Sequence, residues 1–148
     1  MRTKPAFITA IRICTITAIL CAVSLSGQTP PIVIRDAWIR VPAPSKTETA
    51  LYMIIENHSA EKRALVSASS DAAAKLEMHQ MRMEGKVMLM TPIAQIAIPA
   101  GGKATLNPNG FHMMVYGLKT RPKVGDSVNV TLKLDDGTMV PVTAIVKK

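Results

Sequence analysis

One stretch near the middle of the chain, KLEMHQMRMEGKVMLMTP at residues 75–92, concentrates side chains that can bind a metal. It holds five of the ten methionines of the protein together with His79. Thioether and imidazole groups are ligands for soft metals. Methionine is also a common filler of irregular gaps in hydrophobic cores. The residue types alone leave both interpretations open, so the spacing has to distinguish a metal site from an ordinary core.

A second stretch, FHMMV at residues 111–115, supplies part of that spacing. In a β-strand alternate side chains share a face, so His112 and Met114 project together, about 7 Å apart at Cα. Met113, between them, projects to the other face. One face of this strand would therefore carry an imidazole and a thioether side by side.

The same alternation orders the methionine-rich stretch. It places His79 on one face with Met81 and Met83, and it places Met88 on one face with Met90. If these segments meet the strand at 111–115, two histidines and two methionines converge on one site.

Two neutral imidazoles and two thioethers form a soft, uncharged ligand set. Such a set suits Cu(I), whereas carboxylate and carbonyl ligands suit Mg²⁺ or Ca²⁺. Zinc is less favoured, because its usual sites use Cys, His and carboxylates. An ordinary blue-copper centre needs a Cys thiolate, and the two cysteines, Cys14 and Cys21, both lie in the first 26 residues.

Not every methionine and histidine is expected to bind metal. The alternation assigns Met53, Met78 and Met113 to the core, and His58 is expected to be a turn residue in ENHSAEK. For three more methionines two roles stay open: hydrophobic residues at the rim of the site, or reserve copper ligands. These are Met81, Met83 and Met88.

The first 26 residues have the three parts of a secretory signal peptide. A basic start is followed by the uncharged run ICTITAILCAVSL at 13–25 and by small residues before a cleavage point at Gly27. The run is shorter than the roughly 20 residues of a membrane-spanning helix. Cys21 suggests lipoprotein processing, but the large residues before it fit that poorly. We expect a cleaved leader at 1–26 and one exported domain at 27–148.

The rest of the chain alternates short apolar segments with turn residues, which predicts an all-β sandwich. A helical turn is expected only at 69–75, capped by Ser70 or Asp71. Trp38 is expected to anchor the core from its strand. We expect eight or nine short strands from the candidates at 32–41, 50–56, 64–67, 75–83, 86–90, 94–98, 103–106, 111–117, 127–134 and 138–147, with a two-residue hairpin turn at Glu84–Gly85.

The spacing of the candidate ligands matches that of a known family. His79, Met90, His112 and Met114 follow the pattern H-x10-M-x21-H-x-M. Nearly all of the domain is similar to the periplasmic copper chaperones called PCu(A)C. The similar segments are DAWIR (36–40), ALYMIIEN (50–57), IPAGGKATLNPNGFHMMVYGLK (98–119) and VGDSVNVTL (124–132).

The resemblance implies a cupredoxin-like β-sandwich in the periplasm that binds one Cu(I) through these four residues. It also implies delivery of copper toward the binuclear copper site of cytochrome c oxidase, with oxidase subunit II or a Sco-type protein as the recipient. Some relatives carry a His- and Met-rich tail that takes Cu(II). The chain given ends in AIVKK, so we expect no second site of that kind.

The composition argues against other classes of function. The formal net charge of +8 is scattered, with little aromatic interleaving, so we expect no nucleic-acid partner. No Ser or Cys stands with His and a carboxylate in a triad pattern, so we expect no enzyme. We expect a monomer that meets the membrane only through its partner. Two rivals stay open: copper sequestration or resistance without delivery, and a structural β-sandwich that binds no metal.

Overall fold

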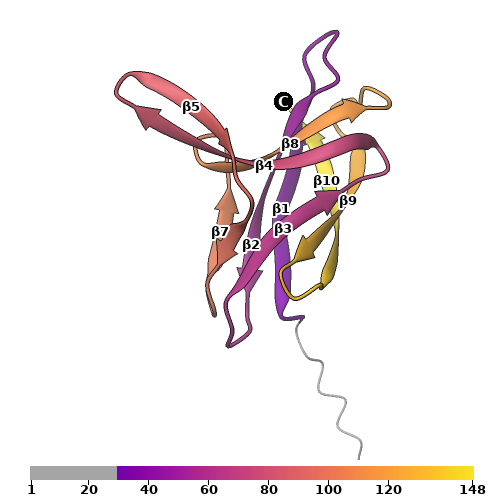
Figure 1. The fold of residues 1–148 in the computed structure, drawn as a ribbon. Helices are drawn as coiled ribbons and strands as arrows, with labels where there is room; N and C mark the ends of the chain where they lie inside the picture. Colours follow the sequence, from indigo (N-terminus) through magenta and orange to yellow (C-terminus); the bar gives the residue numbers. More distant parts are fainter. Residues whose placement is uncertain (1–29) are drawn as a thin grey trace, which may run out of the picture.

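Residues 30–148 form an all-β fold in the computed structural model of the protein, which describes this part of the chain (Figure 1). The predicted leader and its cleavage point lie outside the described residues. No helix within residues 30–148 is long and apolar enough to cross a membrane. This described part of the chain contains ten strands instead of the predicted eight or nine: β1 (Ile32–Arg40), β2 (Thr49–Asn57), β3 (Arg63–Ser69), β4 (Ala73–Glu84), β5 (Val87–Pro92), β6 (Ile96–Ile98), β7 (Lys103–Leu106), β8 (Phe111–Leu118), β9 (Ser127–Leu134) and β10 (Met139–Lys147).

The ten strands form one hydrogen-bonded sheet that curls round a single core. Their order is β5-β4-β8-β7-β2-β1-β10-β9-β3-β6, with an additional pairing of β8 with β2. Neighbours are antiparallel except for the parallel pairs β1–β10 and β7–β8. β3 and β4 lie near opposite ends of this order and nevertheless contact each other. The sheet therefore folds over on itself, which confirms the predicted all-β sandwich class.

Alternation of apolar and polar residues explains why most of the strands form. In β9 every second side chain is buried, and the side chains between face solvent or the edge of the core. β2 lies in the interior of the sheet, between β7 and β8 on one side and β1 on the other, and most of its side chains are buried. Within the described part of the chain, the core draws on every strand except β5.

Residues 69–75 do not form the predicted helical turn. Ser69 ends β3 and Ala73 begins β4, with a short turn between them. The Ser70 hydroxyl accepts a hydrogen bond from the Ala72 amide at 3.2 Å, so the predicted cap closes a turn and not a helix. Pairing of β4 with β8 outweighs the weak local helix preference of the alanines.

Trp38 is not the core anchor that the sequence predicts. Its indole is half-buried outside the core cluster and lies against Tyr52, with ring centroids 4.5 Å apart. The pairing of β1 with β2 is interrupted between Arg35 and Trp38, where Asp36 has φ +50°. A bulge of this kind reverses the faces of all later residues. Ile39 therefore points into the core in place of its neighbour Trp38.

The end of β4 and most of β5 leave the body of the molecule as a two-stranded arm (Figure 1). We define the arm as residues 81–90, where β4 no longer pairs with β8 and pairs with β5 alone. Its turn is Gly85–Lys86, one residue later than predicted. Gly85 has φ +62°, and a glycine in the first turn position is typical of the tight type II′ hairpin.

Candidate metal centre

The three strands that carry the predicted ligands are neighbours in the sheet, in the order β5-β4-β8. His79 lies directly opposite His112, and Met81 lies directly opposite Met90. Residues that face each other across an antiparallel pair project to the same side of the sheet. Met114, two residues from His112, shares that side. The structure thus brings all four predicted ligands to one face, which we call the outer face.

The opposite face of the same strands belongs to the core. Met78 and Met113 lie opposite each other and are both buried. Met53 of β2 is buried in the same cluster. The prediction that these three methionines pack in the core is confirmed.

The two histidines form the deepest part of the outer face. The exposed fraction of His79 is 7% and that of His112 is 3%. Their ring centroids are 5.8 Å apart, and the rings are tilted by 49°. The third histidine, His58, lies in the exposed turn after β2, with its Nε2 3.2 Å from a carboxylate oxygen of Glu56. It is thus the turn residue that the sequence predicts.

Each buried histidine uses one ring nitrogen for a hydrogen bond. His112 Nδ1 lies 3.2 Å from the carbonyl oxygen of Gly110, which can only accept, so Nδ1 carries the proton. His79 Nε2 lies 3.4 Å from a carboxylate oxygen of Glu77 and donates to it. Partners of this kind orient the imidazole of metal-binding histidines and leave the other nitrogen as the ligand.

The remaining nitrogens are buried without any hydrogen-bond partner among the described residues. They are His79 Nδ1 and His112 Nε2. A buried polar atom without a partner costs about 1–3 kcal/mol. An orphaned lone pair on each of two facing imidazoles is what a metal ligand pair requires, so these residues fit a soft metal ion.

Electrostatics keep His112 in its ligating form. Burial lowers the pKa of His112 below the usual 6.5; the Gly110 carbonyl opposes this effect, and the neighbouring His79 adds to it. The pKa of the Glu77 carboxyl is also lowered, mainly by Lys75 and then by its contact with His79. Glu77 thus stays ionised as the acceptor that orients His79, while His112 stays neutral.

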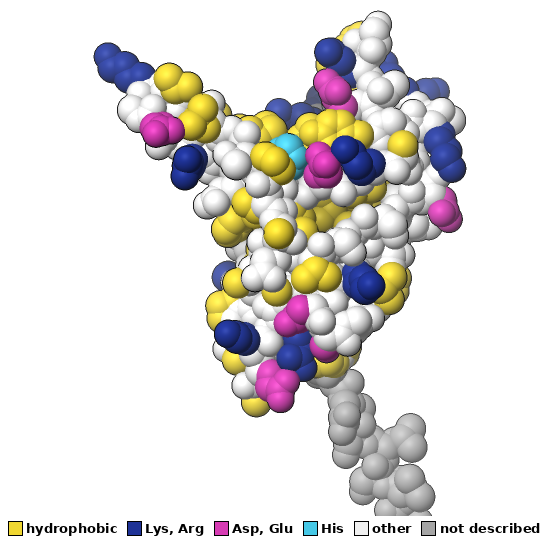
Figure 2. Space-filling view, viewed as in Figure 1, with side chains coloured by type: hydrophobic (Ala, Val, Ile, Leu, Met, Phe, Trp, Pro, Cys, Tyr) yellow, Lys and Arg dark blue, Asp and Glu magenta, His cyan; other side chains and the backbone are white. Residues whose placement is uncertain are grey.

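A pocket of about 280 Å³ opens beside the histidines. His112, Met114, Met90 and Met81 line one side of it, whereas His79 does not reach it. Met114 is half-buried, and the exposed fraction of Met90 is 47%. Figure 2 shows hydrophobic side chains gathered on the arm and about its base. The two thioethers are therefore the accessible part of the predicted ligand set, and the imidazoles are the enclosed part.

Met81 and Tyr52 line the pocket although neither is among the four predicted ligands. Met81, left open between rim hydrophobe and reserve ligand, lines the pocket directly. Its alternation with His79 was the signal that placed it on this face. Tyr52 also lines the pocket, as does Arg40. No sequence signal marks it, because β2 is apolar on both faces.

The outer face carries few hard ligands. No three His, Cys, Asp or Glu side chains within residues 30–148 gather closely enough to hold a metal ion. A metal at this position would have to draw on thioethers besides the two imidazoles. Such a donor set favours Cu(I) over Zn²⁺, Mg²⁺ or Ca²⁺.

The fold and the site together fit one class of protein. Residues 30–148 form an all-β domain in which two imidazole nitrogens without a partner among these residues lie on one face with thioethers, as a domain that binds a soft metal requires. The structure is similar to the copper-bound PCuAC domain from PmoF2, with a TM-score of 0.69, 22% identity, and coverage of 81% of this chain and 95% of that one. It is also similar to the solution structure of CuI-DR1885 from Deinococcus radiodurans, with a TM-score of 0.61, 37% identity, and coverage of 86% and 85%.

The chain belongs to the family described as "Putative lipoprotein LpqE-like", whose family model matches residues 32–146. A relative from Leifsonia xyli subsp. xyli, described as "Putative lipoprotein Lxx21020", is 33% identical over 150 residues, which cover 93% of this chain and 89% of the relative. Together with the structural matches to PCuAC domains, this confirms the resemblance to the PCu(A)C family that the sequence motif indicates.

Proposed function

We propose that the protein is an exported Cu(I) chaperone that holds one copper ion through His79, Met90, His112 and Met114. The observation that carries this proposal is the pair of facing, buried imidazoles, each with a nitrogen that has no hydrogen-bond partner within residues 30–148. The Cu(I)-bound state of a relative that is 37% identical supports the choice of metal.

A purely structural role for the histidines fits less well. Buried polar groups in native proteins are almost always paired. In a purely structural role, the two unpaired nitrogens would lower the stability of the fold without any compensating interaction. Copper would satisfy both at once. The arrangement therefore speaks against the structural sandwich that binds no metal.

The geometry suggests how copper is held and released. The enclosed imidazoles bind from the protein side, while Met90 and Met114 face the pocket. A ligand from a partner protein can enter there and replace a thioether. Because the departing thioether is neutral and takes up no proton, its release needs neither an acid nor a change in the oxidation state of copper. The role is that of a carrier and not of an enzyme.

The proposed destination is the binuclear copper site of cytochrome c oxidase, reached through subunit II or a Sco-type protein. Its support is the resemblance to PCu(A)C chaperones together with the open pocket. The test mixes Cu(I)-loaded protein with the apo soluble domain of subunit II, or with an apo Sco-type protein, under anaerobic conditions. Separation and metal analysis should find copper on the acceptor. If the protein keeps its copper in the presence of either acceptor, the proposed role of delivery is wrong and sequestration takes its place.

We also propose that the protein is exported through its leader to the periplasm. The description of the family and of the relative as lipoproteins supports export and favours attachment at Cys21 over cleavage at Gly27. Mass spectrometry of the mature protein separates the two. A lipid-modified N-terminal Cys21 would mean anchoring, and an unmodified N-terminus at Gly27 would mean release.

A further inference from the structure

The arm carries four methionines in two successive cross-strand pairs. Met81 lies opposite Met90, and Met83 lies opposite Met88. Opposite residues share a face, and alternate residues of one strand share it too, so all four thioethers project to the outer face with the histidines. We call the two pairs together the methionine ladder, with the Met81–Met90 pair as its inner rung and the Met83–Met88 pair as its outer rung.

Hydrophobic packing does not account for the outer rung. The exposed fractions are 60% for Met83 and 54% for Met88, and the core includes no residue of β5 within the described chain. Methionine usually fills irregular gaps in a core, and the outer rung lies outside the core.

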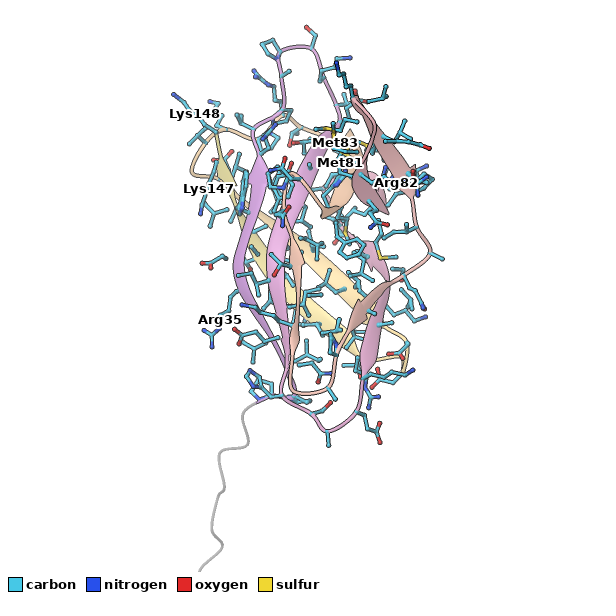
Figure 3. The ribbon with its side chains drawn as sticks, turned by 90° about the vertical axis from the view of Figure 1, so that its left-hand side faces the viewer. Arg35, Met81, Arg82, Met83, Lys147 and Lys148 are labelled. Atoms are coloured by element: carbon cyan, nitrogen blue, oxygen red, sulfur yellow. The ribbon has the colours of Figure 1, made fainter. Side chains whose placement is uncertain are left out.

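The two faces of the arm differ in the kind of apolar residue they carry. The opposite face pairs Arg82 with Leu89 and Glu84 with Val87. Leucine and valine are thus used on that side, and methionine on the other. Figure 3 shows Met81 and Met83 on one side of β4 and Arg82 on the other. Sulfur is confined to the face that continues into the histidine pair.

The ladder also leads from solvent to the centre. Successive rungs are about 7 Å apart along the strand. The outer rung is exposed, the inner rung lines the pocket, and the next position inward on β4 is His79. Methionine has three rotatable bonds, so sulfurs of adjacent rungs can approach the same ion.

We propose that the outer rung of the methionine ladder is a second, weaker Cu(I) site that loads the histidine centre through the inner rung. The outer rung takes Cu(I) first, the inner rung accepts it, and His79 with His112 then retains it. At each step one copper–sulfur bond breaks as a new bond to sulfur or nitrogen forms. Copper stays Cu(I) throughout, and no proton or electron moves. The inference rests on the proposed function, because the histidine centre is the destination.

The test removes sulfur from the outer rung and keeps its apolar surface. The variant is Met83→Leu with Met88→Leu, and the control is Met139→Leu, because Met139 is 55% exposed on β10, far from the arm in the strand order. Protein with ¹³C-labelled methionine methyl groups is titrated anaerobically with Cu(I) and, separately, with Ag(I). The rate of Cu(I) uptake from a small chelator is measured by stopped flow.

The first equivalent should shift the methyl signals of Met90 and Met114, and further metal should shift those of Met83 and Met88 but not that of Met139. The double leucine variant should load several-fold more slowly than wild type and lose the second phase of uptake. Its affinity for the first copper should be unchanged. The Met139→Leu control should behave as wild type in every measurement.

Three results would overturn the ladder. The first is that the Met83 and Met88 signals do not shift with excess metal, and the second is that the leucine variant loads at the wild-type rate. The third is that the Met139 signal shifts together with those of the ladder, which would show unspecific uptake. If leucine preserves loading but Met83→Ser with Met88→Ser abolishes transfer to a partner protein, the arm is an apolar docking surface instead. Failure of the proposed function looks different, because the first equivalent would then leave Met90 and Met114 unshifted.

Discussion

Met113 and Met114 are adjacent in β8 and have opposite surroundings. Met113 is completely buried against Met78, whereas Met114 is half-buried and faces the pocket beside His112. The two side chains have the same chemistry. Only the alternation of the strand separates a core residue from a candidate copper ligand.

This difference shows how one pair of strands serves two purposes. The inner face of β4 and β8 holds the sheet to the core, and the outer face presents the soft ligands. Because the strands are anchored from behind, the outer side chains start from a rigid backbone, as a precise metal site requires. Substitutions on the inner face should therefore change stability, and those on the outer face should change copper binding.

The largest effect is expected for Met113→Ala. The substitution leaves a cavity in the core, and large-to-small changes of this kind cost about 2–5 kcal/mol of unfolding free energy. Denaturant unfolding of the apo protein measures this loss, while the folded fraction should still bind one Cu(I). A loss of about 0.5 kcal/mol or less, as for a surface residue, would contradict the assignment of the inner face.

Met114→Ala should show the reverse pattern. Loss of a residue that only supports a ligand costs metal sites roughly 10- to 100-fold in affinity, and loss of a ligand should cost at least as much. Competition with a Cu(I) chelator measures this affinity. Unfolding free energy should fall by less than for Met113→Ala. Unchanged copper affinity would remove Met114 from the site.

Acidification should weaken both copper binding and the apo fold. Protonated imidazole does not ligate, so Cu(I) affinity should fall between about pH 8 and about pH 5. The pKa of His112 is lowered in the folded state, so its stabilising contribution is present above about 6.5 and is lost as pH falls through the folded-state value. Chelator competition and thermal unfolding across this range measure the two effects.

His58→Ala is the matched control for this pH dependence, because His58 is an exposed histidine away from the outer face. It should leave the pH profile of copper affinity as in wild type. Copper affinity that stays flat across the range would contradict histidine ligation.

The smallest effect is expected for Met78→Leu. Leucine nearly conserves the volume of methionine, and such swaps in a core usually cost less than about 1.5 kcal/mol. Since Met78 uses its side chain only for packing, copper affinity should not change. A clear loss of affinity in a stably folded Met78→Leu protein would mean that the two faces are not separate.

Much of this arrangement could be predicted from local sequence. Turn residues mark the strand ends, so β7 and β9 have the predicted bounds. Alternation correctly separated Met113 from His112, because both faces of a regular strand follow from its period of two. The same rule failed at Trp38, where a bulge that nothing in the sequence marks reverses the faces after Asp36.

Other features depend on contacts between distant segments and could not be read locally. The register that sets His79 opposite His112 joins residues more than thirty positions apart in the sequence. The segment 69–75 has a local preference for helix, but pairing of β4 with β8 outweighs this preference. The arm projects because the pairing of β4 with β8 ends at Gln80 and Phe111, so that β4 beyond this point pairs with β5 alone. Tyr52 lines the pocket from β2, which is distant in sequence from the other strands of the site.

The central claim is that the outer face holds one Cu(I) through its two buried imidazoles. Its most direct test is anaerobic Cu(I) titration against a competing chelator for wild type, for His58→Ala and for the double variant His79→Ala with His112→Ala, each shown to be folded by thermal unfolding. One tightly held copper in wild type and His58→Ala, and none in the double variant, is the predicted result. Equal, weak uptake by all three proteins would contradict this claim. The methionines and histidines would then serve packing and not copper binding.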